Sequence, residues 1–186
     1  MRIIAGQYKG RTLQAPKGRD TRPTADRTRE SLFNVLIHGV GLDFTNLSVV
    51  DLFAGSGGLG LEALSRGAGR ITFVDFDRQA LKCAQGNAAS LGEAKRVLCL
   101  KLDATRLPPP PRAAEAPCGL AFLDAPYGQG LTQPALLGLA QRGWLAGDAV
   151  VVVEVGAEEP LMIGPGFEQL DDRTHGAARV VVLRRG

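Results

Sequence analysis

The 186-residue sequence contains few cysteines and no long apolar run. Its three cysteines, Cys83, Cys99 and Cys118, are odd in number and far apart, a pattern that indicates neither a disulfide framework nor a zinc site. No segment approaches the roughly 20 apolar residues needed to cross a bilayer, and the first residues lack the apolar stretch of a secretory signal. We therefore expect reduced thiols, no bound metal, no membrane contact and a cytoplasmic location.

The composition is otherwise that of an ordinary globular protein, with 45% hydrophobic and 22% charged residues. The formal net charge is only +3, yet residues 1–30 hold eight lysines and arginines against three acidic residues. Clustered positive charge attracts phosphates and releases their counterions. Charge alone leaves two interpretations open, a surface that binds a polyanion or a basic arm exposed to solvent.

Residues 1–46 differ in pattern from the rest of the chain. Short extended pieces separated by glycines predict a small β-hairpin at the start. Thr24 or Asp26 can cap a following helix, which we expect to end near Gly39 or two residues later. We interpret this segment as a basic extension packed on a main domain of residues 47–186, the two making effectively one structural domain.

In the main domain, runs rich in β-forming residues alternate with helical patterns. The predicted strands span residues 47–53, 70–75, 97–102, 120–124, 149–155, 167–170 and 179–183. Asp77 is a predicted N-cap, and a later helix is expected at 131–142. This alternation predicts an α/β fold with an open, mostly parallel sheet and helices on both faces. Four prolines at 108–111 exclude a helix there, so that crossover should be an extended loop or a truncated helix.

Acidic residues end several of these strands, at the edge where open parallel sheets bind their ligands. The loop Gly55-Ser56-Gly57-Gly58-Leu59-Gly60 matches the G-x-G-x-x-G pattern, and Asp75 lies 20 residues after its first glycine, so a nicotinamide dinucleotide is formally allowed. Asp51, just before the loop, would repel a pyrophosphate. S-adenosylmethionine has no phosphate, and an acid can engage its cationic end directly or through water. The pattern therefore favours S-adenosylmethionine.

The candidate cofactor-binding residues all follow from this placement. Asp75 can accept hydrogen bonds from both ribose hydroxyls, Asp103 from the adenine amino group, and the Ala104 amide can pair with the ring edge. The full predicted set is Asp51, Phe53, Ala54, Gly55, Ser56, Gly57, Asp75, Asp103 and Ala104.

The segment Asp124-Ala125-Pro126-Tyr127 follows a buried-looking strand and resembles the Asp/Asn-Pro-Pro-Tyr motif of amino-methyltransferases. An exocyclic amine on a base is a poor nucleophile until acceptors engage its N–H groups. The Asp124 carboxylate and the Ala125 carbonyl can supply two acceptors that orient the nitrogen, and Tyr127 offers a ring on which the base stacks. We predict these four residues as the catalytic set. Ala125 replaces the usual proline, which keeps the carbonyl but removes a φ constraint.

The resemblance extends to a particular family, the bacterial 16S ribosomal RNA guanine-N2 methyltransferases. It is carried by the opening Met1-Arg2-Ile3-Ile4-Ala5-Gly6, by Thr21-Arg22-Pro23-Thr24 and by Asp51-Leu52-Phe53-Ala54-Gly55-Ser56-Gly57. It implies a Rossmann-like class I S-adenosylmethionine-dependent methyltransferase that methylates one guanine N2 in 16S ribosomal RNA, on a partly assembled small subunit. We expect a monomer. Phosphate contacts are then expected from the basic extension, at Arg2, Lys9, Arg11, Arg19, Arg22, Arg27 and Arg29.

Three other functions remain alternatives at this stage. A nicotinamide-dependent oxidoreductase would use the glycine loop and Asp75 but leave Asp51 unexplained. A DNA adenine-N6 methyltransferase would use the same amine chemistry at Asp124, and a non-catalytic RNA-binding module is allowed because a fold alone does not establish function. Glu154 ends a strand without an assigned role, and His38 and His175 have no partner spacing for catalysis or metal binding.

Overall fold

The computed structural model describes residues 1–15 and 23–186, and its centre is a seven-stranded sheet. The strands are β1 (Ser48–Leu52), β2 (Arg70–Asp75), β3 (Val97–Lys101), β4 (Cys118–Asp124), β5 (Leu145–Gly156), β6 (Phe167–His175) and β7 (Ala178–Arg185). Their order in the sheet is β3-β2-β1-β4-β5-β7-β6. Strands β1 to β5 are parallel, and β7 is antiparallel to both β5 and β6. The predicted α/β fold with a mostly parallel sheet is confirmed.

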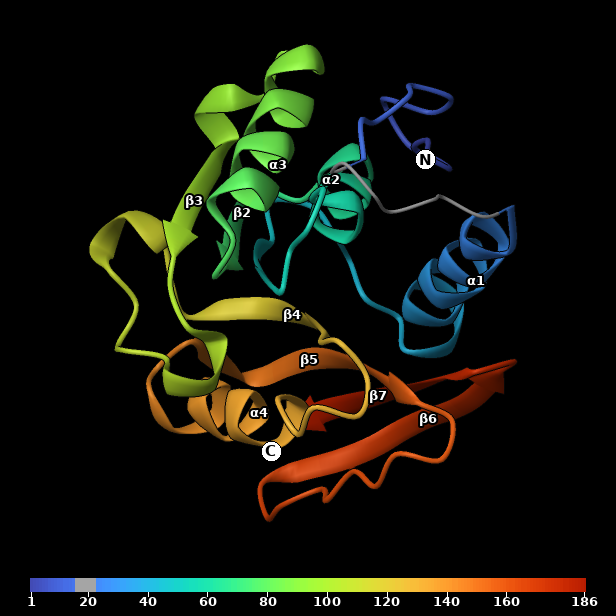
Figure 1. Ribbon diagram of the computed structural model, residues 1–186, viewed down its shortest axis with the longest axis vertical. Coiled ribbons are helices and arrows are strands. Elements are labelled where there is room, and N and C mark those ends of the chain that lie inside the picture. The colour runs from blue at the N-terminus through green and yellow to red at the C-terminus, as the bar shows by residue number, and fades with distance from the viewer. Residues whose placement is uncertain (16–22) are drawn as a thin grey trace.

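Helices cover both faces of the sheet (Figure 1). The helices α1 (Pro23–Asn34), α2 (Gly58–Ser65) and α3 (Arg78–Ser90) lie on one side and α4 (Thr132–Gln141) on the other. Each side has its own buried apolar cluster, with Phe33, Phe73 and Phe122 in the first and Trp144 in the second. Among the described residues, no helix is both long and apolar enough to span a bilayer.

The predicted cap at Asp77 and the predicted break at the proline run are confirmed, whereas Thr24 and Asp26 lie inside their helix and not at its cap. The Asp77 carboxylate accepts a hydrogen bond from the Gln79 amide at 2.8 Å and so caps α3 as predicted. The proline run lies between two single 3₁₀ turns, Ala104–Arg106 and Arg112–Ala114, with no helix in between. The helix of the extension begins at Pro23, slightly before its predicted start, and α1 continues into a π-helical turn at Val35–Gly39.

Strand β6 is longer than its sequence pattern predicts. It was expected to end at residue 170 and instead continues to His175, through exposed or half-buried residues at the edge of the sheet. An edge strand pairs through its backbone while its side chains face water, so it needs no alternation of apolar residues. Polar residues at 171–175 therefore concealed the second half of the strand.

The predicted N-terminal hairpin is present in a short form, with one antiparallel bridge between Arg2 and Thr12 and with further backbone hydrogen bonds between its two arms. Its apolar side chains Ile3 and Leu13 are 1% and 2% exposed and belong to the same cluster as Phe33. Gly6 allows the loop to approach α2 closely, because a Cβ there would lie 2.0 Å from the Ser65 carbonyl oxygen. Backbone hydrogen bonds between the two arms, such as the one from the Ile3 amide to the Arg11 carbonyl at 2.9 Å, close the loop, and packing against α2 holds it on the domain.

Candidate active site

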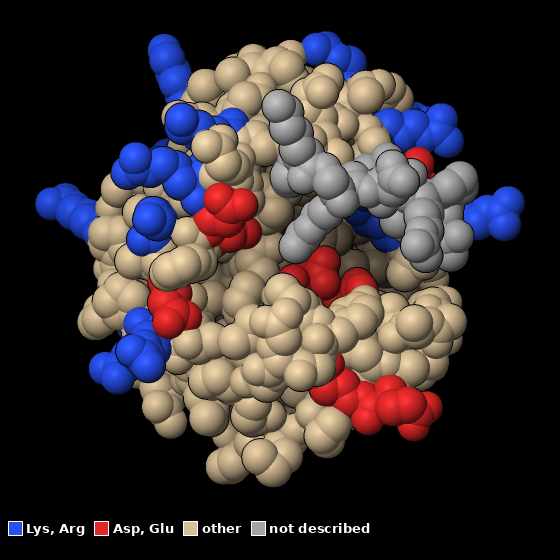
Figure 2. Space-filling model, viewed as in Figure 1, with Lys and Arg blue, Asp and Glu red and all other residues tan. Residues whose placement is uncertain are grey.

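The ends of β1, β2 and β4 open into one cavity of about 290 Å3. Its lining residues are Phe53, Asp75, Asp124, Ala125, Pro126 and Tyr127. Two of the residues predicted to bind the cofactor, Phe53 and Asp75, therefore share one space with the four residues predicted to orient the amine. In the view of Figure 2, most lysines and arginines lie toward the periphery, and acidic side chains lie both near the middle and at the lower right.

The loop after β1 requires glycine for both conformation and space. Gly57 has a φ of +79°, and a Cβ on it would lie 3.0 Å from the Phe73 ring. Phe53, at the strand end, also has a positive φ of +59°, an uncommon conformation for a bulky residue. Ala54 and Ser56 are each 8% exposed, so the loop presents mainly backbone. Such a turn lets a ligand approach the main chain closely.

Asp51 lies beneath this loop rather than on its surface. Its side chain accepts a hydrogen bond from the Gly60 amide at 3.0 Å, and the residue is 2% exposed. Burial raises the pKa of Asp51 well above its ordinary value of 3.8, and the nearby carboxylates of Asp124 and Asp75 raise it further. Asp75 and Asp124 line the cavity, and their two carboxylates favour a cation in that space.

Asp75 is held in place by two backbone amides. One carboxylate oxygen accepts from Gly55 at 3.0 Å and the other from Asp77 at 2.8 Å. The next residue, Phe76, is 73% exposed, although phenylalanine is usually buried. Phe76 is not among the residues predicted from the sequence. An apolar residue directly after a strand-ending acid is a weak signal, and only its exposure beside Asp75 makes it a candidate surface for a flat ring.

Asp103 projects from the neighbouring strand end. Thr105 donates to it from both its hydroxyl, at 2.6 Å, and its amide, at 2.9 Å. These hydrogen bonds lower the pKa of Asp103 below 3.8, and Arg106 lowers it further. The carboxylate is therefore ionised at neutral pH and is an acceptor, while Ala104 is buried directly behind it.

The loop that follows β4 is tied to the end of β5. Asp124 and Ala125 stand at the strand end, where Asp124 pairs in register with Glu154 and Ala125 is 2% exposed. The Tyr127 hydroxyl donates a hydrogen bond to the Glu154 carboxylate, while 42% of the residue remains exposed. Burial and this hydrogen bond raise the pKa of Tyr127 well above 10.0, so the hydroxyl stays protonated. The ring thus lies along the cavity in a fixed orientation.

A second carboxylate holds the next turn of the same loop. Glu159 accepts hydrogen bonds from the amides of Gly128, at 3.0 Å, and Gly156, at 3.2 Å. Neither Glu154 nor Glu159 was assigned a role from the sequence, because their partners in the loop after β4, Tyr127 and Gly128, lie 27 and 31 residues earlier. Together they constrain a loop in which Ala125 replaces a conformationally restricted proline.

The structure corrects the prediction for Arg29. This residue is 7% exposed, and its guanidinium donates to the Arg2 carbonyl at 2.6 Å and pairs with Asp26 at 3.0 Å. Its Nε lies 3.9 Å from the buried carboxylate of Glu62. A guanidinium enclosed in this way cannot reach a phosphate, so Arg29 holds the extension against α2 instead.

The other basic residues of the extension are dispersed. The loop containing Lys9 packs against Ser65, where the Gln7 amide donates to the Ser65 carbonyl at 2.7 Å. Helix α2 begins beside the glycine loop and ends at Ser65, which places Lys9 at the edge of the sheet opposite the cavity. Arg11 donates to the Ser90 carbonyl at the far end of α3.

Two further arginines of the extension are exposed, and two lie outside the described residues. The Arg2 side chain is 68% exposed and lies 3.4 Å from Asp26. Arg27 is exposed on α1 and lines a groove with Glu30, His38 and other residues. The predicted contacts at Arg19 and Arg22 fall outside the residues that the structure describes.

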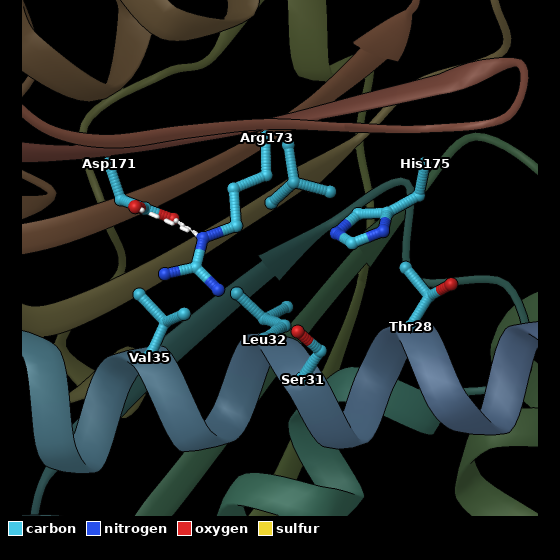
Figure 3. Close-up of a pocket in the computed structure, with 8 residues that line it drawn as sticks. Thr28, Ser31, Leu32, Val35, Asp171, Arg173 and His175 are labelled. Carbon is cyan, nitrogen blue, oxygen red and sulfur yellow. Dashed lines mark hydrogen bonds and ion pairs between the residues drawn. The ribbon is translucent and has the colours of Figure 1, made fainter.

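A smaller pocket between α1 and β6 carries charges of both signs (Figure 3). Thr28 and Ser31 face it from α1, and Arg173 and His175 from β6. Arg173 pairs with Asp171 at 2.8 Å, so this pocket has no excess of positive charge. It is not a candidate for binding a polyanion.

Comparison with known proteins adds independent information. The chain matches, over residues 1–184, the family described as conserved hypothetical protein 95. It is 38% identical to Bacillus subtilis YlbH, which bears the name of an rRNA methyltransferase, over 100% of this chain and 99% of that one. It is 36% identical to the Escherichia coli ribosomal RNA small subunit methyltransferase D, over 89% of this chain and 79% of that one. Its fold matches the solved structure of the E. coli protein yhhF, described as a methyltransferase, with a TM-score of 0.83, 33% identity and coverage of 100% and 97%.

Proposed function

Because the chain belongs to the conserved hypothetical protein 95 family and is an S-adenosylmethionine-dependent rRNA methyltransferase, we propose that its target is the exocyclic N2 amine of a guanine in 16S ribosomal RNA. The observation that carries this proposal is the shared cavity, in which Asp75 and Phe53 face Asp124 and Tyr127. Methyl transfer requires that the cofactor, which donates the methyl group, and the amine, which accepts it, lie in one cavity. The nicotinamide alternative is set aside by the family.

The strand ends of the first half of the sheet fit the cofactor. The glycine loop leaves no room for a Cβ at Gly57, and Asp75 is fixed where it can accept from two ribose hydroxyls. Exposed Phe76 offers a flat apolar surface beside it, and Asp103 an ionised acceptor on the next strand. The carboxylates around Asp51 provide a negative environment for a cationic ligand. The bound cofactor supplies the electrophilic methyl group.

The loop after β4 orients the nucleophile. The Asp124 carboxylate and the Ala125 carbonyl accept hydrogen bonds from the two N–H groups of the amine, which directs the nitrogen lone pair toward the methyl group. Tyr127 stacks against the base and contributes roughly 1–3 kcal/mol. A base inside a helix cannot reach such a cavity, so the guanine must be unpaired or flipped out of its stack.

We also propose the setting of the reaction. The protein acts as a monomer on a partly assembled small subunit, where the target guanine is still accessible. In the described extension, Arg27 is exposed and Arg2 is 68% exposed although it pairs with Asp26, so these two arginines can contact phosphates together with Arg19 and Arg22, which lie between them in the sequence.

A methyl-transfer assay tests this proposal directly. Labelled S-adenosylmethionine is incubated with small-subunit particles, deproteinised 16S ribosomal RNA and double-stranded DNA, and the modified nucleoside is identified. We expect label on the N2 of guanine in RNA. Label on the N6 of adenine in DNA would establish the alternative with the same amine chemistry, and no transfer to any polymer would favour a non-catalytic module.

Replacement of Asp124 separates chemistry from cofactor binding. In Asp124→Ala, one of two acceptors for the amine is lost, so we expect transfer to fall by about 100-fold or more. Calorimetry should give an affinity for S-adenosylmethionine close to that of the wild type. Asp75→Ala is the matched control, because there the cofactor affinity itself should fall. Equal loss of affinity in both variants would contradict the role given to Asp124.

A further inference from the structure

A second group of basic side chains lies at the cavity edge of the sheet, outside the extension. Four exposed residues, defined here as the β3 rim, are Arg78, Lys82, Lys101 and Arg106. The first two belong to α3, one turn apart, so both project from the same face of that helix. Lys101 ends β3, and Arg106 ends the turn that follows.

Contacts between the elements show that the β3 rim is continuous. Lys101 pairs in register with Asp75 of the cavity, and its ammonium lies 5.7 Å from the centre of the Phe76 ring, two residues before Arg78. Helix α3 packs on β3, with the Cys99 sulfur 3.9 Å from the Leu81 carbonyl oxygen, next to Lys82. In Figure 2, lysines and arginines gather on the side of the molecule where α3 and β3 lie in Figure 1.

Within the described parts of the chain, none of the four side chains forms an ion pair. Arginines at the amino ends of the same strands do form ion pairs. There Arg70 pairs with Glu115, and Arg96 pairs with Glu93. The charge of the β3 rim is therefore available to a partner, whereas the arginines at the other edge are already used to hold the fold.

The acids near the β3 rim do not neutralise it through direct contacts. Asp75 and Asp77 direct their carboxylates to backbone amides, and Asp103 directs one oxygen to Thr105. In contrast, Lys9 and Arg11 of the extension lie toward the far edge of the sheet. Positive charge beside the cofactor half of the cavity therefore comes from the β3 rim and not from Lys9 or Arg11 of the extension.

We propose that the β3 rim binds backbone phosphates of the substrate RNA, which then lies across the cavity from α1 to α3 and β3. This inference rests on the proposed function, because it takes an RNA as the occupant. The chemistry is that of ammonium and guanidinium groups on a phosphate backbone, without base recognition. Phosphate contacts on both sides of the cavity would fix the position of the RNA strand along the protein, while one base enters the cavity between these contacts.

Salt dependence of binding distinguishes phosphate contacts from indirect effects. Each neutralised phosphate adds about 0.7 to 0.9 to the slope of log affinity against log salt concentration. We therefore compare the full-length wild type with Arg78→Gln/Lys82→Gln, using deproteinised 16S ribosomal RNA and oligouridine as probes. The absolute slope should be smaller for the variant than for the wild type, by about 1.4 on oligouridine and by about 1.4 to 1.8 on 16S ribosomal RNA.

A matched control removes two charges from the opposite edge. Lys95 and Arg142 are also exposed, at the amino end of β3 and the carboxyl end of α4, and Lys95→Gln/Arg142→Gln should keep the wild-type slope. The S-adenosylmethionine affinity of both variants should equal that of the wild type, which verifies that they fold.

The possible outcomes separate this inference from the proposed function. Equal slopes for the two double variants would overturn the β3 rim as a phosphate surface, even with methyl transfer intact. Weaker binding to small-subunit particles with an unchanged slope on both RNA probes would also overturn it, in favour of a ribosomal protein as partner. A reduced slope in a protein that methylates no polymer would support the surface and overturn the proposed reaction.

Discussion

At the scale of single residues, the buried acid beneath the glycine loop has a measurable consequence for stability. The folded protein raises the pKa of Asp51 well above 3.8, so the native state holds a proton that the unfolded chain releases. The contribution of this group to the free energy of unfolding is therefore complete below about pH 4 and is lost as pH rises through the folded pKa. Above that pKa, an ionised carboxylate is buried.

We expect Asp51→Asn to remove this pH dependence. The amide oxygen still accepts from Gly60, while the side chain no longer titrates. Urea unfolding of the cofactor-free protein at several pH values between 4 and neutrality should show a flatter profile for the variant than for the wild type. Asp148→Asn, at an exposed position, serves as the control. A variant with the same slope as the wild type would contradict burial as the cause.

The hydrogen bond between Tyr127 and Glu154 predicts a specific effect on the rate of methyl transfer. In Glu154→Ala the Tyr127 ring loses its anchor, and misplacement of a bound base by a fraction of an ångström should lower single-turnover transfer by about 10- to 100-fold. Glu154→Gln keeps an acceptor oxygen and should remain within a few-fold of the wild type. Glu158→Ala, at an exposed neighbouring position, should have no effect.

Sequence reasoning succeeded for residues whose role is local and failed for those whose partner is distant. Asp77 caps the helix that begins at the next residue, so the sequence contains the whole interaction. Arg29 was wrongly predicted to contact phosphate, because its burial depends on the packing of α1 against the loop of Arg2 and against α2, which the sequence does not record. Glu154 was left without a role for the same reason, since Tyr127 approaches it only when β4 and β5 pair.

At the scale of elements, one buried glutamate joins the extension to the helix below the cofactor loop. Glu62 is fully buried in α2 and accepts hydrogen bonds from the amides of Ile4, at 2.8 Å, and Ala5, at 3.0 Å. It also pairs with Arg66 at 2.9 Å. A carboxylate with this many donors compensates for its burial, and its removal leaves several polar groups unpaired.

Glu62→Ala should therefore destabilise the protein by about 3–5 kcal/mol, the range for breaking a buried ion pair from one side. Urea denaturation measures the change, and hydrogen exchange at Ile4 and Ala5 should increase more than exchange in β4. The exposed Glu30→Ala on α1 should change stability by less than about 0.5 kcal/mol. A similar small change for Glu62→Ala would mean that the extension docks through apolar contacts alone.

Helices and strands could be predicted where their buried residues form a regular apolar pattern in the sequence, and they were missed where no such pattern exists. The parallel strands, with buried residues along most of their length, were located to within a few residues. The second half of β6 and the detailed form of the N-terminal loop were not predicted. β6 exposes its side chains, and the loop is held by the Ser65 and Glu62 contacts, which no short-range pattern records.

At the scale of the whole molecule, we propose that residues 1–46 and 47–186 fold as one unit. Ile3 and Leu13 of the extension share a cluster with Phe122 of β4, while the other face of the sheet packs around Trp144. Trp144, the single tryptophan, thus reports on the face opposite the extension. Its fluorescence and the far-ultraviolet circular dichroism should give one coincident unfolding midpoint. Two separated transitions would show that the extension unfolds alone.

The order of strands in the sheet separates two tasks in space. Proposed cofactor residues come from β1, β2 and β3, whereas the loop for the amine comes from β4 and is fixed by β5. The antiparallel turn between β6 and β7 lies on that second side, where the Ala157 amide donates to the Ala177 carbonyl. A change in the length or composition of this turn would therefore alter the surface beside β5 while leaving the residues of β1, β2 and β3 unchanged.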